Sequence, residues 1–521
     1  MVAAGLEEKP WISERVVETI EGFSLRKEDD VSRPRLLEPS LTIREELCDF
    51  MLDMRRSDQS NHVLMKPDDT LALRYFVSNE SGEPPSKRYN AENYRAYAGL
   101  TTSFGMRGWR CSHAMGGVLA MFALVAILAS GARAGTPEVI YSLAGDDDGE
   151  YTDTDLVIDG AGNLYGTSVL GGDFGGGTVF QLTPSGKGWI HTVLYSFTGG
   201  ADGGEPYKGV TLDAQGNLYG TAVTGGAGSC EGGCGVAYKL TNSGGTWSQT
   251  VIHAFSGGDD GSGPGAGLTF DMQGNLYGVA PTGGAYGLGV IYQLHADAIG
   301  NWTLKVIHTF TGGTDGATGS AGRLLLHAGR LYGVATVGGA NGKGVAFELA
   351  PITLSSQATE WNLKAIYAFK GQPDAGFPYG GLLLDASGNL YGTTYYDGAN
   401  DLGSVYQLSP AAAGRWNEKV LYSFRGGEDG QNSISNLVID AAGNLYGTTS
   451  EGGAGCGCGT IFKLAPGAKG TWTESVVHSF GGPPDGAFPY NGMVADSAGN
   501  FYGATVHGGT DGEGSIYKFT P

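Results

Sequence analysis

Acidic residues recur at one place along this chain, in a segment that reads loosely as G-G-x-D-G. Carboxylate oxygens suit Ca²⁺ and the hydroxyl groups of sugars, so a circle of them around a common axis predicts a site for a cation or a polyhydroxylated ligand. The alternative is structural, because an Asp that precedes Gly can accept hydrogen bonds within its own turn. Apart from Ca²⁺, no cofactor or metal site is expected. The candidate ligand-binding aspartates are Asp148, Asp202, Asp260, Asp315, Asp374, Asp429 and Asp485.

A second aspartate follows eleven residues later in six of the copies and opens a D-x-x-G-N turn. Its side chain can accept a backbone N–H of that turn, so we interpret it as structural. In the fourth copy, Leu326 stands where this aspartate is expected, and Arg330 replaces the Asn. The six residues are Asp159, Asp213, Asp271, Asp385, Asp440 and Asp496.

Three copies carry a Pro-Tyr pair just after the first aspartate, with Tyr207, Tyr379 and Tyr490 as the aromatic residues. A ligand is seldom sevenfold symmetric, so residues that distinguish some copies from others are the better candidates for ligand contact. We therefore predict that these tyrosines contact a ligand. The alternative is aromatic packing beneath a proline turn.

The cysteines of the repeat region come as two close pairs, Cys230 with Cys234 and Cys456 with Cys458. After export each pair can oxidise and pin its own loop, although C-G-C closes a small ring. A zinc site built from all four thiolates would need loops of distant copies to meet. No catalytic motif such as G-x-S-x-G or H-E-x-x-H is present, so no catalytic residue is predicted.

These residues belong to a repeat of about 55 residues, a period that fits a four-stranded propeller blade. In the second copy, apolar runs predict strands at 210–213, 218–221, 236–240 and 247–255. The sequence thus predicts an all-β, seven-bladed β-propeller with four antiparallel strands in each blade. The tyrosines that mark the copies are Tyr165, Tyr219, Tyr277, Tyr332, Tyr391, Tyr446 and Tyr502.

Six tryptophans each precede a phenylalanine by eight residues, as Trp247 precedes Phe255. An even offset predicts that both rings lie on the same face of the fourth strand, where they pack between blades.

The two ends of the repeat region are complementary. Residues 139–143 match the fourth strand of a blade, and residues 515–519 match the third, after which the chain ends. We expect these segments to pair, so that three carboxyl-terminal strands and one amino-terminal strand form the seventh blade.

The pattern G-L-x-x-D-x-x-G-N-L-Y-G-T-T, followed by G-G-x-x-G-x-G-T-V-F, resembles the GloVer tandem repeat of exported bacterial proteins. Residues 385–394, D-A-S-G-N-L-Y-G-T-T, match it closely, and the resemblance extends over all seven copies. It implies export and supplies no catalytic residues. The pattern is more distantly similar to NHL-type repeats, whose blades begin with the strand nearest the axis. That strand order would bring the seven aspartates and three tyrosines to one face.

The chain has 53 acidic and 32 basic residues, a net charge of −21. This charge repels phosphate backbones, so nucleic acid is not an expected partner.

Residues 106–134 have the order of a secretory signal, with Arg107 and Arg110, an apolar stretch at 116–129 and an A-x-A site ending at Ala134. Cleavage there predicts a secreted, periplasmic or cell-surface protein, whereas an uncleaved signal anchor would be its contact with the membrane. Residues 1–105 form an extension without an assigned role, and a true start of translation at Met106 is the preferred explanation. The propeller is predicted to span residues 135–521.

The leading hypothesis is an exported, monomeric, non-enzymatic propeller that binds a glycan, a peptide or a partner protein on its loop face. The alternative is an extracellular lyase or glycosidase that uses acidic residues at the axial funnel. A structural protein of the envelope or matrix is a third hypothesis.

Overall fold

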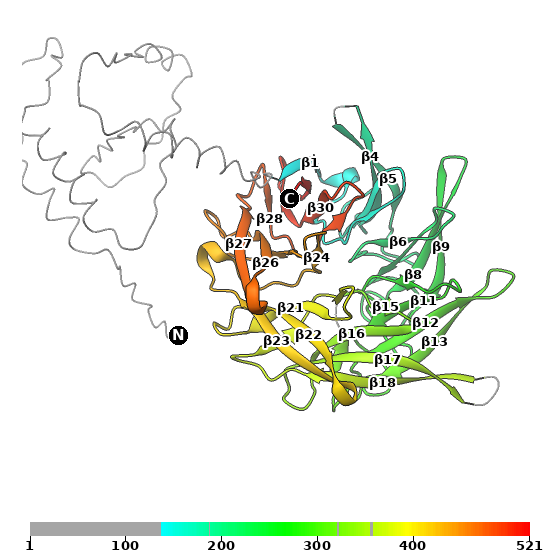
Figure 1. Cartoon of the computed structure of the whole chain (residues 1–521). Coiled ribbons are helices and arrows are strands. Elements are labelled where there is room, and N and C mark those ends of the chain that lie inside the picture. The colour runs from blue at the N-terminus through cyan, green and yellow to red at the C-terminus, as the bar shows by residue number, and fades with distance from the viewer. Residues whose placement is uncertain (1–136, 187, 320–321, 355–357) are drawn as a thin grey trace, which may run out of the picture. The chain divides into compact units, whose positions relative to one another are not determined.

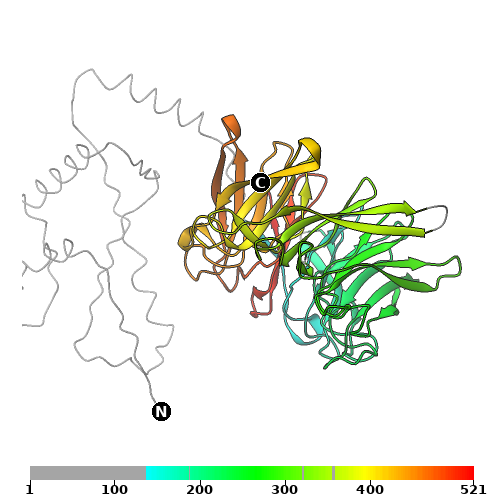
Figure 2. The same cartoon turned by 90° about the horizontal axis from the view of Figure 1, so that it is seen from below.

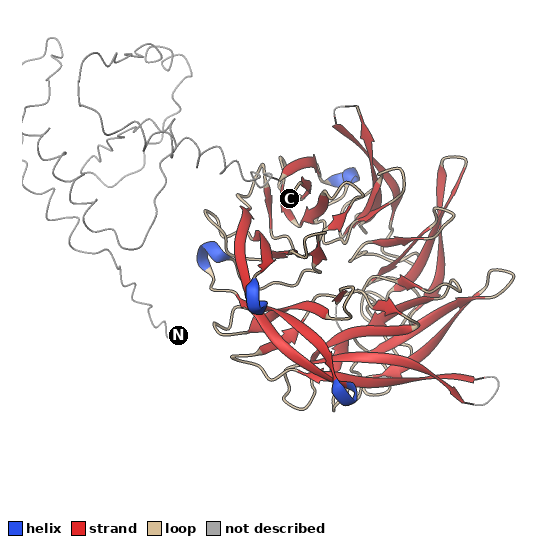
Figure 3. Cartoon of the chain, in the orientation of Figure 1, coloured by secondary structure: helices blue, strands red, loops and turns tan. Residues whose placement is uncertain are grey.

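The computed structural model describes residues 137–186, 188–319, 322–354 and 358–521. The predictions for residues 1–105 and for the signal-like segment 106–134 lie outside these ranges. Antiparallel strands dominate the described part (Figure 3). Within it, no helix is long and apolar enough to cross a membrane. The described residues also include four short 3-10 helices in connecting loops: η2 (Asp146–Asp148), η4 (Ala412–Gly414), η5 (Gly427–Asp429) and η6 (Ala468–Gly470).

The strands form seven antiparallel sheets arranged in a ring, so the predicted seven-bladed β-propeller is confirmed (Figure 1). In blades one, two, three and six the strands are hydrogen-bonded in chain order, from the inner strand to the outer strand. Blade one comprises β2 (Val157–Ile158), β3 (Leu164–Ser168), β4 (Thr178–Ser185) and β5 (Gly188–Ser196). Blade two comprises β6 (Val210–Leu212), β7 (Leu218–Ala222), β8 (Val236–Ser243) and β9 (Thr246–Ala254). Blade three comprises β10 (Thr269–Phe270), β11 (Leu276–Ala280), β12 (Val290–Ala296) and β13 (Trp302–Thr309).

Blades four and five have a divided inner strand. Blade four comprises β14 (Ala317–Gly319), β15 (Leu325–His327), β16 (Arg330–Val337), β17 (Val345–Leu354) and β18 (Ala358–Ala368). Its long β17–β18 hairpin, yellow-green in the figures, extends outward from the ring (Figure 2). Blade five comprises β19 (Ala375–Pro378), β20 (Leu383–Leu384), β21 (Leu390–Asp397), β22 (Ser404–Ala411) and β23 (Arg415–Ser423). Blade six comprises β24 (Val438–Ile439), β25 (Leu445–Thr449), β26 (Thr460–Pro466) and β27 (Trp472–Ser479).

Blade seven is closed by the amino-terminal strand, as the sequence predicts. It comprises β29 (Val494–Ala495), β30 (Phe501–Thr505), β32 (Ser515–Phe519) and β1 (Glu138–Ser142), with β1 as its outer strand. The register of the closing pair runs from Glu138 opposite Lys518 to Ser142 opposite Ser515. The short strands β28 (Gly486–Ala487) and β31 (His507–Gly508) form a separate antiparallel pair. Closure leaves no free sheet edge between the first and last blades.

The core is divided into layers between neighbouring blades. The glycine of the L-Y-G-T strand leaves room for an aromatic ring of the next strand in the same blade, as Gly220 illustrates, because the ring of Tyr238 lies directly over it. A Cβ at Gly220 would come within 2.4 Å of the Tyr238 hydroxyl oxygen. Tyr238 is itself fully buried and packs edge-on against Phe197 of blade one, with ring centroids 5.0 Å apart.

The prediction that Trp and Phe share a face of the outer strand is wrong. Trp247 packs in the layer between blades one and two, whereas Phe255 packs in the layer between blades two and three. The cause is a β-bulge in β9 beside the Ala237/Tyr238 step of β8, where the register shifts. One extra residue in a strand reverses the alternation of side chains beyond it. Both rings nevertheless pack between blades, as expected.

Blade four differs from the others in its first turn. Leu326 pairs with Leu331 as Leu384 pairs with Leu390, so Leu326 occupies a strand position and does not replace the aspartate. The turn has instead shortened to Ala328 and Gly329, which both have positive φ, as a two-residue hairpin requires. The shortened turn borders a surface groove of about 700 Å³ between blades three and four.

Candidate functional site

The seven predicted aspartates lie beside the ends of the outer strands, and six of them accept hydrogen bonds that organise their own loops. Asp202 is typical, because it accepts hydrogen bonds from the Tyr195 hydroxyl and the Thr198 amide, both at 2.9 Å. Burial alone would raise the pKa of Asp202, but the hydrogen bonds from Thr198 outweigh it and lower the pKa. These contacts give the carboxylates the structural role of the alternative hypothesis, and ligand binding by them stays a prediction.

Histidine replaces the tyrosine partner in three blades. The distances between the paired side chains are 3.0 Å for His253 and Asp260, 3.1 Å for His308 and Asp315, and 2.9 Å for His478 and Asp485. Each of these histidines stands seven residues before its aspartate, a spacing that would have revealed the pair in the sequence.

Of the three remaining aspartates, Asp148 and Asp429 keep the tyrosine partner. Asp429 accepts from the Tyr422 hydroxyl at 2.5 Å and from the Arg425 amide at 2.7 Å. Asp148 accepts from the Tyr141 hydroxyl at 2.8 Å and also contacts His191 at 2.9 Å. Asp374 faces solvent near Lys370. Within the described residues, no group of three or more acidic, histidine or cysteine side chains is arranged to hold a metal ion.

The second set of aspartates has the expected turn geometry. Asp159 accepts hydrogen bonds from the Asn163 amide at 2.9 Å and from the Tyr165 hydroxyl at 3.1 Å. The same pattern recurs in the five equivalent turns. These aspartates stabilise the hairpins on the face opposite the candidate site.

The three predicted tyrosines come together at one mouth of the central channel. Tyr207 and Tyr490 both lie close to Asp153, and burial followed by neighbouring charges, that of Asp153 included, raises the pKa of each phenol. Tyr379 lies near the ammonium group of Lys208. Its ring centroid is 6.2 Å from that of Tyr395.

The floor beneath these tyrosines is a buried polar cluster that sequence analysis missed. Lys208 donates from Nζ to Asp153 Oδ1 at 2.8 Å and to Asn491 Oδ1 at 2.6 Å. Asn491 also donates from Nδ2 to Asp153 at 2.6 Å. Burial would lower the pKa of Lys208, but the charges of Asp153 and Asp155 outweigh it and raise the pKa.

A second polar layer lies deeper in the channel. Asn436 of blade six donates from Nδ2 to both carboxylate oxygens of Asp155 of blade one, at 3.1 and 3.0 Å. Arg323 of blade four donates from Nη2 to the Val210 carbonyl of blade two at 3.1 Å. These contacts join blades that are not neighbours in the ring, so they cross the channel. Burial, the largest influence on Asp155, raises its pKa.

The signal for this layer was present in the sequence as a departure from the repeat. The residue just before the first buried apolar residue of each inner strand is glycine in four blades and polar in three. We call this the axial position. Its occupants are Asp155, Gly209, Gly267, Arg323, Gly381, Asn436 and Gly492.

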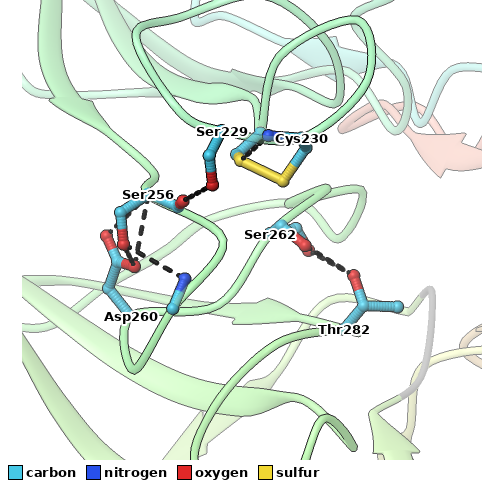
Figure 4. The surroundings of a disulfide bond; sticks show 8 residues. Ser229, Cys230, Ser256, Asp260, Ser262 and Thr282 are labelled. Atoms are coloured by element: carbon cyan, nitrogen blue, oxygen red, sulfur yellow. Dashed lines mark hydrogen bonds between the residues drawn. A yellow bond between two sulfur atoms is a disulfide. The ribbon is translucent and has the colours of Figure 1, made fainter.

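The two cysteine pairs form disulfides within their own loops. Cys230 is bonded to Cys234 in blade two, and Cys456 to Cys458 in blade six. Figure 4 shows the first of these beside the Ser256–Asp260 turn, where Ser229 donates from its hydroxyl to the Ser256 carbonyl at 3.4 Å. Both bridges fix loops near outer-strand ends, so their role is local.

The fold and the site together define a seven-bladed β-propeller whose channel is crossed by charged and polar side chains. The chain belongs to the Gloeobacter/Verrucomicrobia repeat family, whose model matches residues 228–415 and 352–521. No curated protein matches the chain.

Three solved structures are similar to the chain at low identity. A candidate 6-phosphogluconolactonase from Bacteroides uniformis is 14% identical with a TM-score of 0.41, covering 62% of this chain and 84% of its own. A protein from Lactobacillus plantarum is 13% identical with a TM-score of 0.39, and the match covers 66% of this chain and 88% of that protein. A protein of unknown function from Dyadobacter fermentans is 13% identical with a TM-score of 0.38, covering 75% and 99%.

Proposed function

We propose that the chain is an exported, non-enzymatic binding protein that holds a glycan at the tyrosine-lined mouth of its channel. One observation carries the proposal. Tyr207, Tyr379 and Tyr490 come from blades two, five and seven, yet all three surround the same floor of Lys208 and Asp153. Export rests on the signal-like order of residues 106–134.

The chemistry of the mouth suits a sugar better than an apolar peptide. Aromatic rings stack on the C–H faces of sugar rings, and the hydroxyl groups of a sugar both donate and accept hydrogen bonds. Tyr379 is exposed to 38%, so a ligand at the mouth can reach its ring. The ammonium of Lys208 and the carboxylate of Asp153 supply a donor and an acceptor at the base.

The backbone around the mouth is held in an uncommon conformation. Two residues before each of the tyrosines Tyr207, Tyr379 and Tyr490, and at the equivalent position of blades one and six, the chain has a residue other than glycine with positive φ. Such strain persists only where the surrounding structure imposes it, and it occurs often at binding sites. These residues are Tyr151, Glu205, Phe377, Asn432 and Phe488, with φ from 53° to 59°.

A glycan array probed with the full chain tests the proposal, followed by titration calorimetry on any glycan retained. The variant Y207A/Y379A/Y490A removes the three rings, and Y286A is the matched control because Tyr286 is 62% exposed in another loop. We expect the triple variant to lose at least about tenfold in affinity, which corresponds to about 1.4 kcal/mol, while Y286A binds normally.

Unchanged glycan affinity in the triple variant would overturn the mouth as the binding site. Binding of a peptide or protein that requires the same tyrosines would retain the site and change its ligand. The lyase or glycosidase alternative is tested on a polysaccharide panel with D153N and D155N. Turnover that these variants abolish would overturn the non-enzymatic assignment.

A further inference from the structure

The half of the channel away from the tyrosines contains a cavity of about 220 Å³. Its polar wall consists of Asp155, Arg323 and Asn436, and its apolar wall includes Leu156, Val157 and Met493. These residues come from blades one, four, six and seven, so the cavity lies on the axis of the ring. We propose that it is a second binding site, which takes one ring of a neutral sugar or a similar small polyol.

The polar wall is assembled from the three departures from glycine at the axial position. Four blades have glycine there, so the ring can close without any side chain at this depth. Burying charged groups in a protein carries a large desolvation penalty, and well-packed apolar residues often serve stability as well. A ligand that needs both groups accounts for the presence of Asp155 and Arg323 at this position despite that penalty.

The geometry of this wall is fixed by hydrogen bonds within the wall and to neighbouring backbone groups. Asn436 Oδ1 accepts from the Gly381 amide at 2.6 Å while its Nδ2 holds Asp155. Arg323 is anchored through Nη2 to the Val210 carbonyl. A guanidinium group has five N–H donors, and this bond uses one of them. The site is thus preorganised, with a carboxylate acceptor and a forked donor on one wall.

The balance of charge selects a neutral ligand. One carboxylate and one guanidinium share the wall, so neither an anion nor a cation gains a net attraction. Vicinal hydroxyl groups donate to Asp155 and accept from Arg323 at the same time, and the C–H face of the ring packs against Val157 and Met493. The volume is below the range of about 300–1,000 Å³ typical of larger ligands, which restricts the occupant to one small ring.

This cavity is separate from the mouth site. The Asp155–Asn436 pair lines both this cavity and a smaller one on the side of Tyr379 and Lys208. The smaller cavity has a volume of about 10 Å³ that is open to the centre of a water molecule, which is room for one water. The pair therefore forms a septum between the two halves of the channel, and a glycan at the mouth does not fill the inner cavity.

The test titrates the full chain with a panel of neutral monosaccharides and polyols, together with the matching uronates, by calorimetry. We expect one neutral compound to bind the wild type. R323M and D155N should each weaken it by at least about tenfold, the loss of one or two charged hydrogen bonds. V157F, which narrows the cavity from its apolar wall and leaves the charges in place, should also weaken binding. Urea unfolding of each variant checks that it remains folded.

The mouth variant Y207A/Y379A/Y490A separates this proposal from the proposed function, because it should bind the small polyol as the wild type does. Loss of polyol binding in that variant would overturn the second site. So would the absence of binding by every neutral compound, tighter binding of a uronate than of its neutral parent, or normal binding by folded R323M and V157F.

Discussion

Lys208 Nζ lies 2.6 Å from Asn491 Oδ1 across the central channel, although 283 positions separate the two residues along the chain. Lys208 precedes the inner strand of blade two, and Asn491 precedes that of blade seven. Blade one lies between them, and its Asp153 accepts from both side chains. The buried ammonium group of Lys208 therefore links blades two, one and seven, on both sides of the junction between the first and last blades.

Replacing this cation should destabilise the propeller strongly. In K208M the Asp153 carboxylate stays buried without its charged partner, and breaking such a pair typically costs about 3–5 kcal/mol. Urea unfolding measures the change. K370M is the matched control, since Lys370 is 62% exposed and its pair with Asp374 should contribute less than about 1 kcal/mol. A loss for K208M no larger than that for K370M would contradict this role.

The stability of the propeller should fall as the pH rises through neutrality. Burial, with a further contribution from nearby Asp429, raises the pKa of Glu474 to about 7, above its value of about 4.3 in unfolded chains. The folded state therefore holds the proton more tightly, so this stabilisation is complete at acidic pH and is lost as pH rises through about 7.

The variant E474Q mimics the protonated side chain and should remove part of this pH dependence. Urea midpoints measured from about pH 5 to about pH 8 should separate, with E474Q increasingly the more stable protein. E428Q, at an exposed position in the loop between blades five and six, should follow the wild type. Parallel curves for E474Q and the wild type would show that Glu474 carries no such proton.

The close packing over the L-Y-G-T strand predicts intolerance of even one methyl group. G220A places a Cβ against the buried Tyr238 ring, and overpacking of this kind typically costs about 1–3 kcal/mol. G188A is the control, because no atom lies within 4 Å of a Cβ at Gly188. Thermal unfolding should show a clear loss for G220A and little change for G188A. Equal melting temperatures would mean that the ring moves aside without loss.

Ring closure predicts a sharp boundary at the amino end of the domain. A chain that begins at residue 137 keeps β1 and should unfold cooperatively. A chain that begins at residue 144 loses β1 and Leu143, whose burial alone contributes about 2 kcal/mol, and exposes the edge of β32. Size-exclusion chromatography should then show association. A monomeric, equally stable shorter chain would contradict the closure.

The repeat made the architecture predictable because each copy carries a complete blade in its local pattern. The comparison of the copies also singled out Tyr207, Tyr379 and Tyr490, because the Pro-Tyr pair occurs in only three of them. The faces of Trp247 and Phe255 were predicted wrongly, because a bulge in β9 changes the parity that sequence offset assumes.

The inner polar layer could not be assembled from spacing. Asp155 meets Asn436 only because the ring brings blades one and six to the same channel, a relationship that depends on curvature and closure. Its members could still have been marked as candidates, because Arg323 and Asn436 interrupt a run of glycines at one repeat position.

The pairing of β1 with β32 also determines how the molecule responds to mechanical load. Glu138 lies opposite Lys518, so the chain enters β1 and leaves β32 at the same end of this antiparallel pair. Tension that draws these ends apart peels the strands open one residue pair at a time, beginning at Glu138, and does not shear all the bonds together. A molecule pulled from both termini would therefore yield first at blade seven, while the other six sheets remain intact.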